Sequence, residues 1–454
     1  MFETSTTQPP RRRSVGIRVL ILALLALAFV IPLSIVRSIV EERQGLRDGA
    51  LADIRQSWGG PQTLAGPVLI AVRSCSRSAG EAAAWSTSQS VVLLPKHYSI
   101  DGAVEAETLK RGLHETAVLR AAITVEGDFP PLQGAFPLIA CDSARLERAT
   151  IVLALTEARG LDEIGDLEWN GAALPWESGS VDGPWNPGMH VDLPLERVEA
   201  AAAQGGSFRL HLKVRASERL SFLPLGSPTR VQLTSKWPTP SFRGAFLPKT
   251  RTLTGEGFRA TWDIPALARS LPPSWQGAPP SSAAPAESQF GAEWLIPADG
   301  YLRTERALKY GLMFVGATFA CLYFFELFGR RALHPMHYLL VGAALIVFYL
   351  LLLSLSEQLG FTIAYGLATG ATTVLVSGYA VSILGGWLRG ASLGAALAGF
   401  YAALFFLLRA EEHALLVGSI GLFAALAVVM WLTRRIDWSN PRLGHAPVQA
   451  AEQP

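Results

Sequence analysis

The stretch RRALHPMHYLLVGAALIVFYLLLLSLSEQLGF, residues 330–361, decides the fold class of this chain. No charged side chain lies between Tyr338 and Leu355. A helix over these residues is about 27 Å long, close to the roughly 30 Å of a bilayer core. Pro335 ends any preceding helix, and Tyr338 is the kind of aromatic residue found at membrane interfaces. The stretch therefore predicts a membrane span that follows a basic, solvated turn.

Five more apolar runs of similar length predict a polytopic protein with six transmembrane helices, one N-terminal and five C-terminal. The runs are Val15–Val36, Leu308–Leu327, Tyr338–Leu355, Phe361–Leu384, Ala391–Leu408 and His413–Leu432. Only 17% of the chain is charged, against about a quarter in soluble proteins. The first run is longer than the apolar core of a signal peptide, and it contains no small-residue cleavage site before Pro32, so we expect a retained anchor.

Arginines flank alternate ends of these spans. Arg11–Arg13, the pair Arg330 and Arg331, Arg389, and the pair Arg434 and Arg435 fall on one side. The intervening short loops are poor in positive charge, a pattern typical of cytoplasmic arginines. It predicts cytoplasmic termini and a large external domain inserted after the first span. The predicted domains are a tail at 1–14, the first span at 15–37, the outer domain at 38–305, the five-helix bundle at 306–435 and a tail at 436–454.

The outer domain is predicted to begin with an amphipathic helix, residues 38–58, because Leu46, Ala50, Ile54 and Trp58 recur at helical spacing. We favour a role in coupling the domain to the membrane over a lipid-sensing role.

Beyond this helix the pattern has period two. In SFRLHLKVR, residues 207–215, the apolar side chains Phe208, Leu210, Leu212 and Val214 alternate with polar ones. This alternation indicates half-buried strands. We expect a β-rich sandwich with a short helix at Leu195–Gln204.

No set of residues predicts catalysis or metal binding. His334 and His337 have the spacing of two ligands on one helical turn, but no third ligand lies near them. Ser392 of GASLG and His413 would lie at opposite membrane faces, too far apart for a nucleophile and its base. The net charge of +2 gives no sign of nucleic-acid binding. Cys75 and Cys141 could pair in an oxidising compartment, and no cofactor is expected.

Four blocks resemble the CreD family of bacterial inner-membrane proteins. They are IRQSWGGPQTLAGPVLIAV (Ile54–Val72), LTSKWPTPSFRGAFLP (Leu233–Pro248), the opening stretch Arg330–Phe361 and LTRRIDW (Leu432–Trp438). The resemblance implies an inner-membrane location and a role in cell-envelope integrity. It also implies control by a sensor kinase and response regulator, and a link to envelope stress, including exposure to cell-wall antibiotics. No established catalytic activity accompanies the family, so we expect a non-enzyme.

The matched blocks suggest residues of interest. Trp237, Pro238, Pro240, Phe242 and Phe246 form either an outer contact loop or a rigid turn. His334, Pro335 and Met336 are expected to shape the inner turn, and Glu357 to pair at the outer interface.

Three functions compete at this stage. The first is a periplasmic domain that binds an unknown envelope component or protein, anchored in the lipid bilayer by the bundle. The second is a transporter or flippase of an envelope component. Ionisable groups at mid-membrane would favour it, whereas Glu326 and Glu357 fall at span ends. The third is a membrane-bound cell-wall or lipid hydrolase.

Overall fold

The computed structural model describes residues 15–77, 85–136, 143–179, 188–269, 271–276, 285–296, 300–329, 333–409 and 414–434. The chain divides into two compact units. The β unit is Arg47–Pro297, and the helical unit combines Met1–Leu46 with Ala298–Pro454. The β unit is shorter at both ends than the predicted 38–305, because Val40 belongs to the core of the helical unit and Tyr301 packs against that core.

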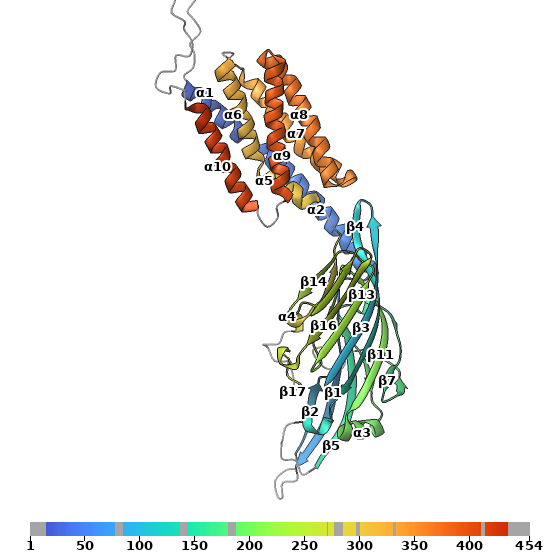
Figure 1. Ribbon diagram of the computed structural model, residues 1–454. Helices are drawn as coiled ribbons and strands as arrows, with labels where there is room; N and C mark the ends of the chain where they lie inside the picture. Colours follow the sequence, from blue (N-terminus) through green and yellow to red (C-terminus); the bar gives the residue numbers. More distant parts are fainter. Residues whose placement is uncertain are drawn as a thin grey trace, which may run out of the picture. The chain divides into compact units, whose positions relative to one another are not determined.

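The helices begin with α1 (Val15–Ala28) and α2 (Val30–Trp58), which meet at Phe29. The remaining long helices are α5 (Gly300–Lys309), α6 (Gly311–Gly329), α7 (Pro335–Leu359), α8 (Phe361–Leu384), α9 (Trp387–Arg409) and α10 (Ala414–Thr433) (Figure 1). Pro32 lies in the first turn of α2, where its missing N–H breaks no helical hydrogen bond. The helix predicted at 38–58 is thus the C-terminal part of a longer helix that starts inside the first apolar run.

Within the described residues, four helices are long and apolar enough to cross a membrane, or five if α5 and α6 together form one span. The predicted span Leu308–Leu327 is not one straight helix, because α5 and α6 meet at an angle of 50°. The sequence changes character at this point. The α5 segment GYLRTERALK is polar, whereas α6 has a single charged residue, Glu326.

The β unit contains two nine-stranded sheets. Sheet A runs β14 (Pro240–Gly244), β18 (Phe290–Trp294), β12 (Arg219–Phe222), β1 (Gln62–Arg77), β5 (Ser143–Leu155), β10 (Gly188–Asp192) and β9 (Glu177–Ser178), with β2 (Trp85–Leu93) on β1 and β17 (Ser274–Gln276) on β2. Sheet B runs β15 (Thr250–Thr254), β16 (Gly257–Ile264), β13 (Thr229–Ser235), β3 (His97–Arg111), β4 (His114–Phe129), β11 (Gly206–Ser217), β7 (Leu167–Trp169) and β8 (Ala172–Leu174), with β6 (Leu161–Ile164) on β11. The pairing is antiparallel except for β1 with β12 and β3 with β13. Two short helices, α3 (Leu195–Gln204) and α4 (Pro285–Ser288), complete the unit.

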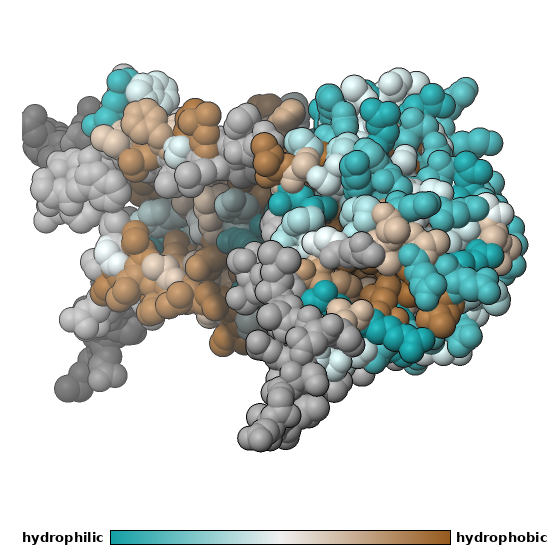
Figure 2. Space-filling model, turned by 90° about the horizontal axis from the view of Figure 1, so that it is seen from below, coloured by the Kyte–Doolittle hydropathy of each residue, from teal (hydrophilic) through white to brown (hydrophobic). Residues whose placement is uncertain are grey.

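One apolar core includes residues from both sheets, so the β unit is a sandwich. Phe208, Leu210, Leu212 and Val214 of β11 are all buried, which confirms the predicted face of this strand. The helix predicted at Leu195–Gln204 is α3. The surfaces of the two units differ in hydropathy. Hydrophilic side chains gather over the β unit and hydrophobic ones over the helices (Figure 2).

Candidate functional site

The block Trp237–Phe246 lies at one edge of the sandwich. Pro240 opens β14, the last strand of sheet A. The Phe242 ring meets two rings of β16 in sheet B, with centroids 5.6 Å from Phe258 and 5.7 Å from Trp262. Phe242 of sheet A thus packs against sheet B, so β14 covers the core at this edge of the sandwich.

Phe246 continues the same packing. Its ring lies edge-on to Phe290 at 6.0 Å, and its carbonyl accepts a hydrogen bond of 3.1 Å from Trp262 Nε1. Trp237 is half-buried, and its Nε1 has no hydrogen-bond partner in the described part of the chain. Pro238 is exposed. The structure therefore turns Phe242 and Phe246 toward the core, and Pro238 with the neighbouring Leu247 toward solvent.

A groove of about 760 Å³ lies at one end of sheet B. Its charged side chains come from the start of β3, the end of β4, and β7, β11, β13 and β16: His97, Glu126, Asp128, Glu168, Arg209, Arg230 and Asp263. His97 Nδ1 lies 2.6 Å from Asp128 Oδ1, and Arg209 Nε donates to Glu126 Oε1 at 2.8 Å. A hydrogen bond from Lys249 lowers the pKa of Asp263. The groove offers both signs of charge to a polar ligand.

Sequence reasoning did not find this groove. Its lining comes from six strands, and these residues meet only when the sheet forms. The one available signal was that Arg209 lies on the outward face of the alternating SFRLHLKVR segment.

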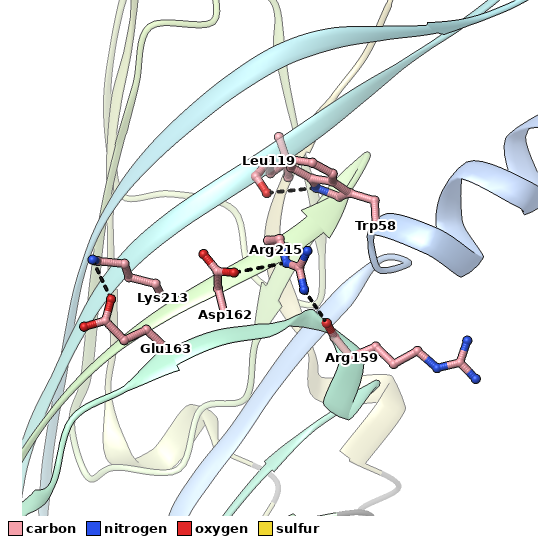
Figure 3. Close-up of polar contacts among 7 residues, drawn as sticks. All are labelled: Trp58, Leu119, Arg159, Asp162, Glu163, Lys213 and Arg215. Carbon is pink, nitrogen blue, oxygen red and sulfur yellow. Dashed lines mark hydrogen bonds and ion pairs between the residues drawn. The ribbon is translucent and has the colours of Figure 1, made fainter.

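The end of α2 is attached to sheet B by hydrogen bonds and cation–π contacts around Trp58 (Figure 3). Trp58 Nε1 donates to the Leu119 carbonyl at 3.4 Å, and the guanidinium groups of Arg120 and Arg215 lie 5.1 and 5.8 Å from its ring. Arg215 also donates to the Arg159 carbonyl at 3.3 Å and lies 3.4 Å from Asp162. Such cation–π contacts fix the orientation of the indole ring.

Further contacts hold the same helix segment. Arg55 donates to Glu218 at 2.7 Å, and Leu51 and Ile54 pack against Val118 of β4. The helix ends at Trp58. The next residue, Gly59, has a φ of +124°, which is strained for other residues, and a Cβ there would lie 3.1 Å from the Arg215 carbonyl oxygen. The last two turns of α2 are therefore fixed to sheet B within the β unit.

In the helical unit, His334, Pro335 and Met336 form the start of α7. The His334 side chain caps the helix by accepting a 3.2 Å hydrogen bond from the Met336 N–H, and Pro335 is the first helical residue. His337 Nδ1 instead lies 2.6 Å from the hydroxyl of Tyr379 on α8. The two histidines thus face different partners, and the described residues contain no group of three potential metal ligands.

Both glutamates at span ends have partners. Glu357 accepts a 2.9 Å hydrogen bond from Tyr301 of α5. Glu326 is only 8% exposed, forms an ion pair with Arg18 of α1 and accepts a 2.9 Å hydrogen bond from Tyr338. The sequence placed Glu326 at a span end but gave no sign of its partner.

Among the cysteines, Cys75 is disulfide-bonded and Cys321 carries a free thiol. The residue predicted as a possible partner of Cys75, Cys141, lies outside the described residues.

Several apolar helices joined to a β unit define a multi-pass membrane protein. Comparison with known proteins makes this specific: the family model described as "Inner membrane protein CreD" matches residues 14–439, and the chain belongs to that family. The inner membrane protein CreD of Escherichia coli (strain K12) is 32% identical over 423 residues, which cover 91% of each chain. The resemblance seen in the sequence is thereby confirmed, and with it a multi-pass location in the inner membrane.

Solved structures add little. A zinc metallopeptidase of the M1 class from Deinococcus radiodurans is 14% identical, covering 44% of this chain and 42% of its own, with a TM-score of 0.21. A substrate-bound mutant of the enzyme is 12% identical, covering 75% and 94%, also with a TM-score of 0.21. TM-scores this low support no inference about the fold or activity of this chain.

Proposed function

We propose that this protein is a non-enzymatic inner-membrane protein that supports envelope integrity by binding an envelope component or partner protein through its β unit. The observation that carries the proposal is the β unit itself. It has its own core and a polar groove, and it is inserted between apolar helices. Membership of the CreD family is consistent with an envelope role.

The proposed topology has six spans, cytoplasmic termini and a periplasmic β unit. The arginine pattern supports this orientation, and α10 supplies the sixth helix. The disulfide at Cys75 is the kind of bond that persists in an oxidising compartment such as the periplasm.

The test is a deletion strain challenged with detergent and a cell-wall antibiotic. It is complemented with the full chain or with residues 1–297, which keep the β unit and the first span. Rescue by both would support function through periplasmic binding. If only the full chain rescues while the shorter chain accumulates normally, the bundle takes part and simple binding fails.

The groove can be tested in the full chain. We expect Arg209→Ala with Arg230→Ala to reduce rescue, because both arginines line it. Arg251→Ala is the matched control, since Arg251 is an exposed arginine of β15 outside the groove lining. Equal rescue by both variants would exclude the groove as the binding surface.

One observation favours the second candidate function, transport or flipping of an envelope component. The bent pair α5 and α6 forms an interrupted helix, a feature that transporters use near their binding sites. Single cysteines along α6 and α7 would test it. Labelling by a water-soluble reagent along a continuous path would support transport, and labelling confined to the helix ends would exclude it.

A further inference from the structure

The break between α5 and α6 leaves backbone donors without acceptors. Across it, the Tyr310 N–H bonds to the Ala307 carbonyl and the Phe314 N–H to the Tyr310 carbonyl, both at 3.1 Å. In the described part of the chain, the N–H groups of Gly311, Leu312 and Met313 have no backbone acceptor. Unsatisfied backbone groups are costly in an apolar environment, and a break is tolerated where another group satisfies them.

A side-chain hydroxyl faces the same place. Tyr349 of α7 is 1% exposed, and its hydroxyl has no hydrogen-bond partner within the described residues. A Cβ on Gly311 would lie 3.4 Å from this oxygen and 2.7 Å from a methyl group of Leu33. Glycine therefore lets the first residue of α6 approach Tyr349 closely.

The local charge favours a negative ligand. The start of α6 carries the positive end of the helix dipole. In α5, Arg303, Arg306 and Lys309 against Glu305 give a net charge of 3 − 1 = +2. Arg306 and Lys309 lie in its last turn, next to the break.

We propose that the N-terminus of α6 and the Tyr349 hydroxyl form a binding site for a phosphate-type oxyanion. The ligand accepts hydrogen bonds from the backbone N–H groups and from Tyr349. Its source is either the headgroup of an anionic phospholipid or free phosphate. The site is independent of the groove and of any partner of the β unit.

The test uses the purified full chain with two probes. Inorganic phosphate is titrated onto the protein in neutral detergent, and phosphatidylglycerol is titrated into phosphatidylcholine nanodiscs that contain it. The melting temperature and the binding isotherm are recorded. We expect saturable binding of one probe and a loss of about tenfold or more in affinity for Tyr349→Phe, since a hydrogen bond to a charged group is removed. Tyr379→Phe, the same change on α8, should keep the affinity.

The outcomes separate the sources. Saturation by inorganic phosphate identifies the free ion, and saturation by phosphatidylglycerol alone identifies the headgroup. Binding of neither probe, or equal binding by Tyr349→Phe and the wild type, overturns the proposal. Without ligand, Tyr349→Phe should be at least as stable as the wild type. A large loss of stability would show that the hydroxyl already has a partner, which also overturns the proposal.

Discussion

Among single residues, Glu326 has an environment that makes its contribution measurable. It is buried between Arg18 and Tyr338, so Glu326→Ala would leave a cation and a hydroxyl without their shared acceptor. We expect a loss of about 2–3 kcal/mol in the free energy of unfolding, below the usual cost of breaking a buried pair because Arg18 is partly solvated. Reversible unfolding in mixed micelles measures it.

The control for Glu326 is Arg37→Gln, which breaks the exposed pair of Arg37 with Glu41 and should cost about 0.5 kcal/mol or less. Replacing Arg18 and Glu326 together by leucine should restore most of the lost stability. Equal losses for Glu326→Ala and Arg37→Gln would show that the buried pair is not formed.

The buried face of β11 and the pair of Arg18 with Glu326 show what the sequence can and cannot predict for single residues. The buried face of β11 follows from alternation, which is local. The pairing of Arg18 with Glu326 joins residues 308 positions apart, and many arginines and glutamates could have been partners. Similarly, proline and aromatic residues in Trp237–Phe246 were compatible with a contact loop or a rigid turn, because local composition does not say which side of a strand faces the core.

Among the elements, α2 allows a test of its attachment to sheet B. Gly59→Ala should destabilise the protein by about 1–3 kcal/mol, because alanine is strained at φ +124° and its methyl group would meet the Arg215 carbonyl at 3.1 Å. Gly49→Ala lies in the same helix with nothing within 4 Å. It should stabilise by about 0.5–1 kcal/mol. Denaturant unfolding followed by tryptophan fluorescence measures both, and effects of the same sign would contradict this account of the helix end.

The strand β14 decides between the two interpretations of the Trp237–Phe246 block. Phe242→Ala should cost about 2–3 kcal/mol, because it removes a ring that bridges the two sheets. Leu247→Ala, at a side chain that is 67% exposed, should change stability by less than about 0.5 kcal/mol. If Phe242→Ala unfolds at the wild-type denaturant concentration yet fails to complement the deletion strain, Phe242 acts in contact rather than in folding.

Element types were more predictable than their ends. Alternation identified the strand around Phe208, since the pattern is repeated over several residues, and the helix expected at Leu195–Gln204 is α3. The apolar pattern missed the bend at Tyr310, because an apolar count across Leu308–Leu327 averages over the break. It also began the amphipathic helix at residue 38, although α2 starts at Val30. The change from apolar to amphipathic composition alters what the helix contacts without ending the helix.

For the whole molecule, the division into an apolar helical unit and a polar β unit follows from composition, since long uncharged runs and period-two segments occupy separate parts of the chain. Orientation is a further step, because it rests on arginines in short loops. It can be tested with two single cysteines in a Cys321→Ser background. Leu113→Cys lies in the turn between β3 and β4, and Met336→Cys, at a site that is 53% exposed, lies at the start of α7.

We expect a membrane-impermeant maleimide to label Leu113→Cys in intact spheroplasts and Met336→Cys only after lysis, because the proposed topology puts the β unit outside and the start of α7 inside. The Cys321→Ser parent controls for labelling of the remaining cysteines. The reverse pattern would place the groove of sheet B in the cytoplasm. Binding of a periplasmic component would then be impossible, whereas the oxyanion site, which depends only on contacts within the helical unit, would be unaffected.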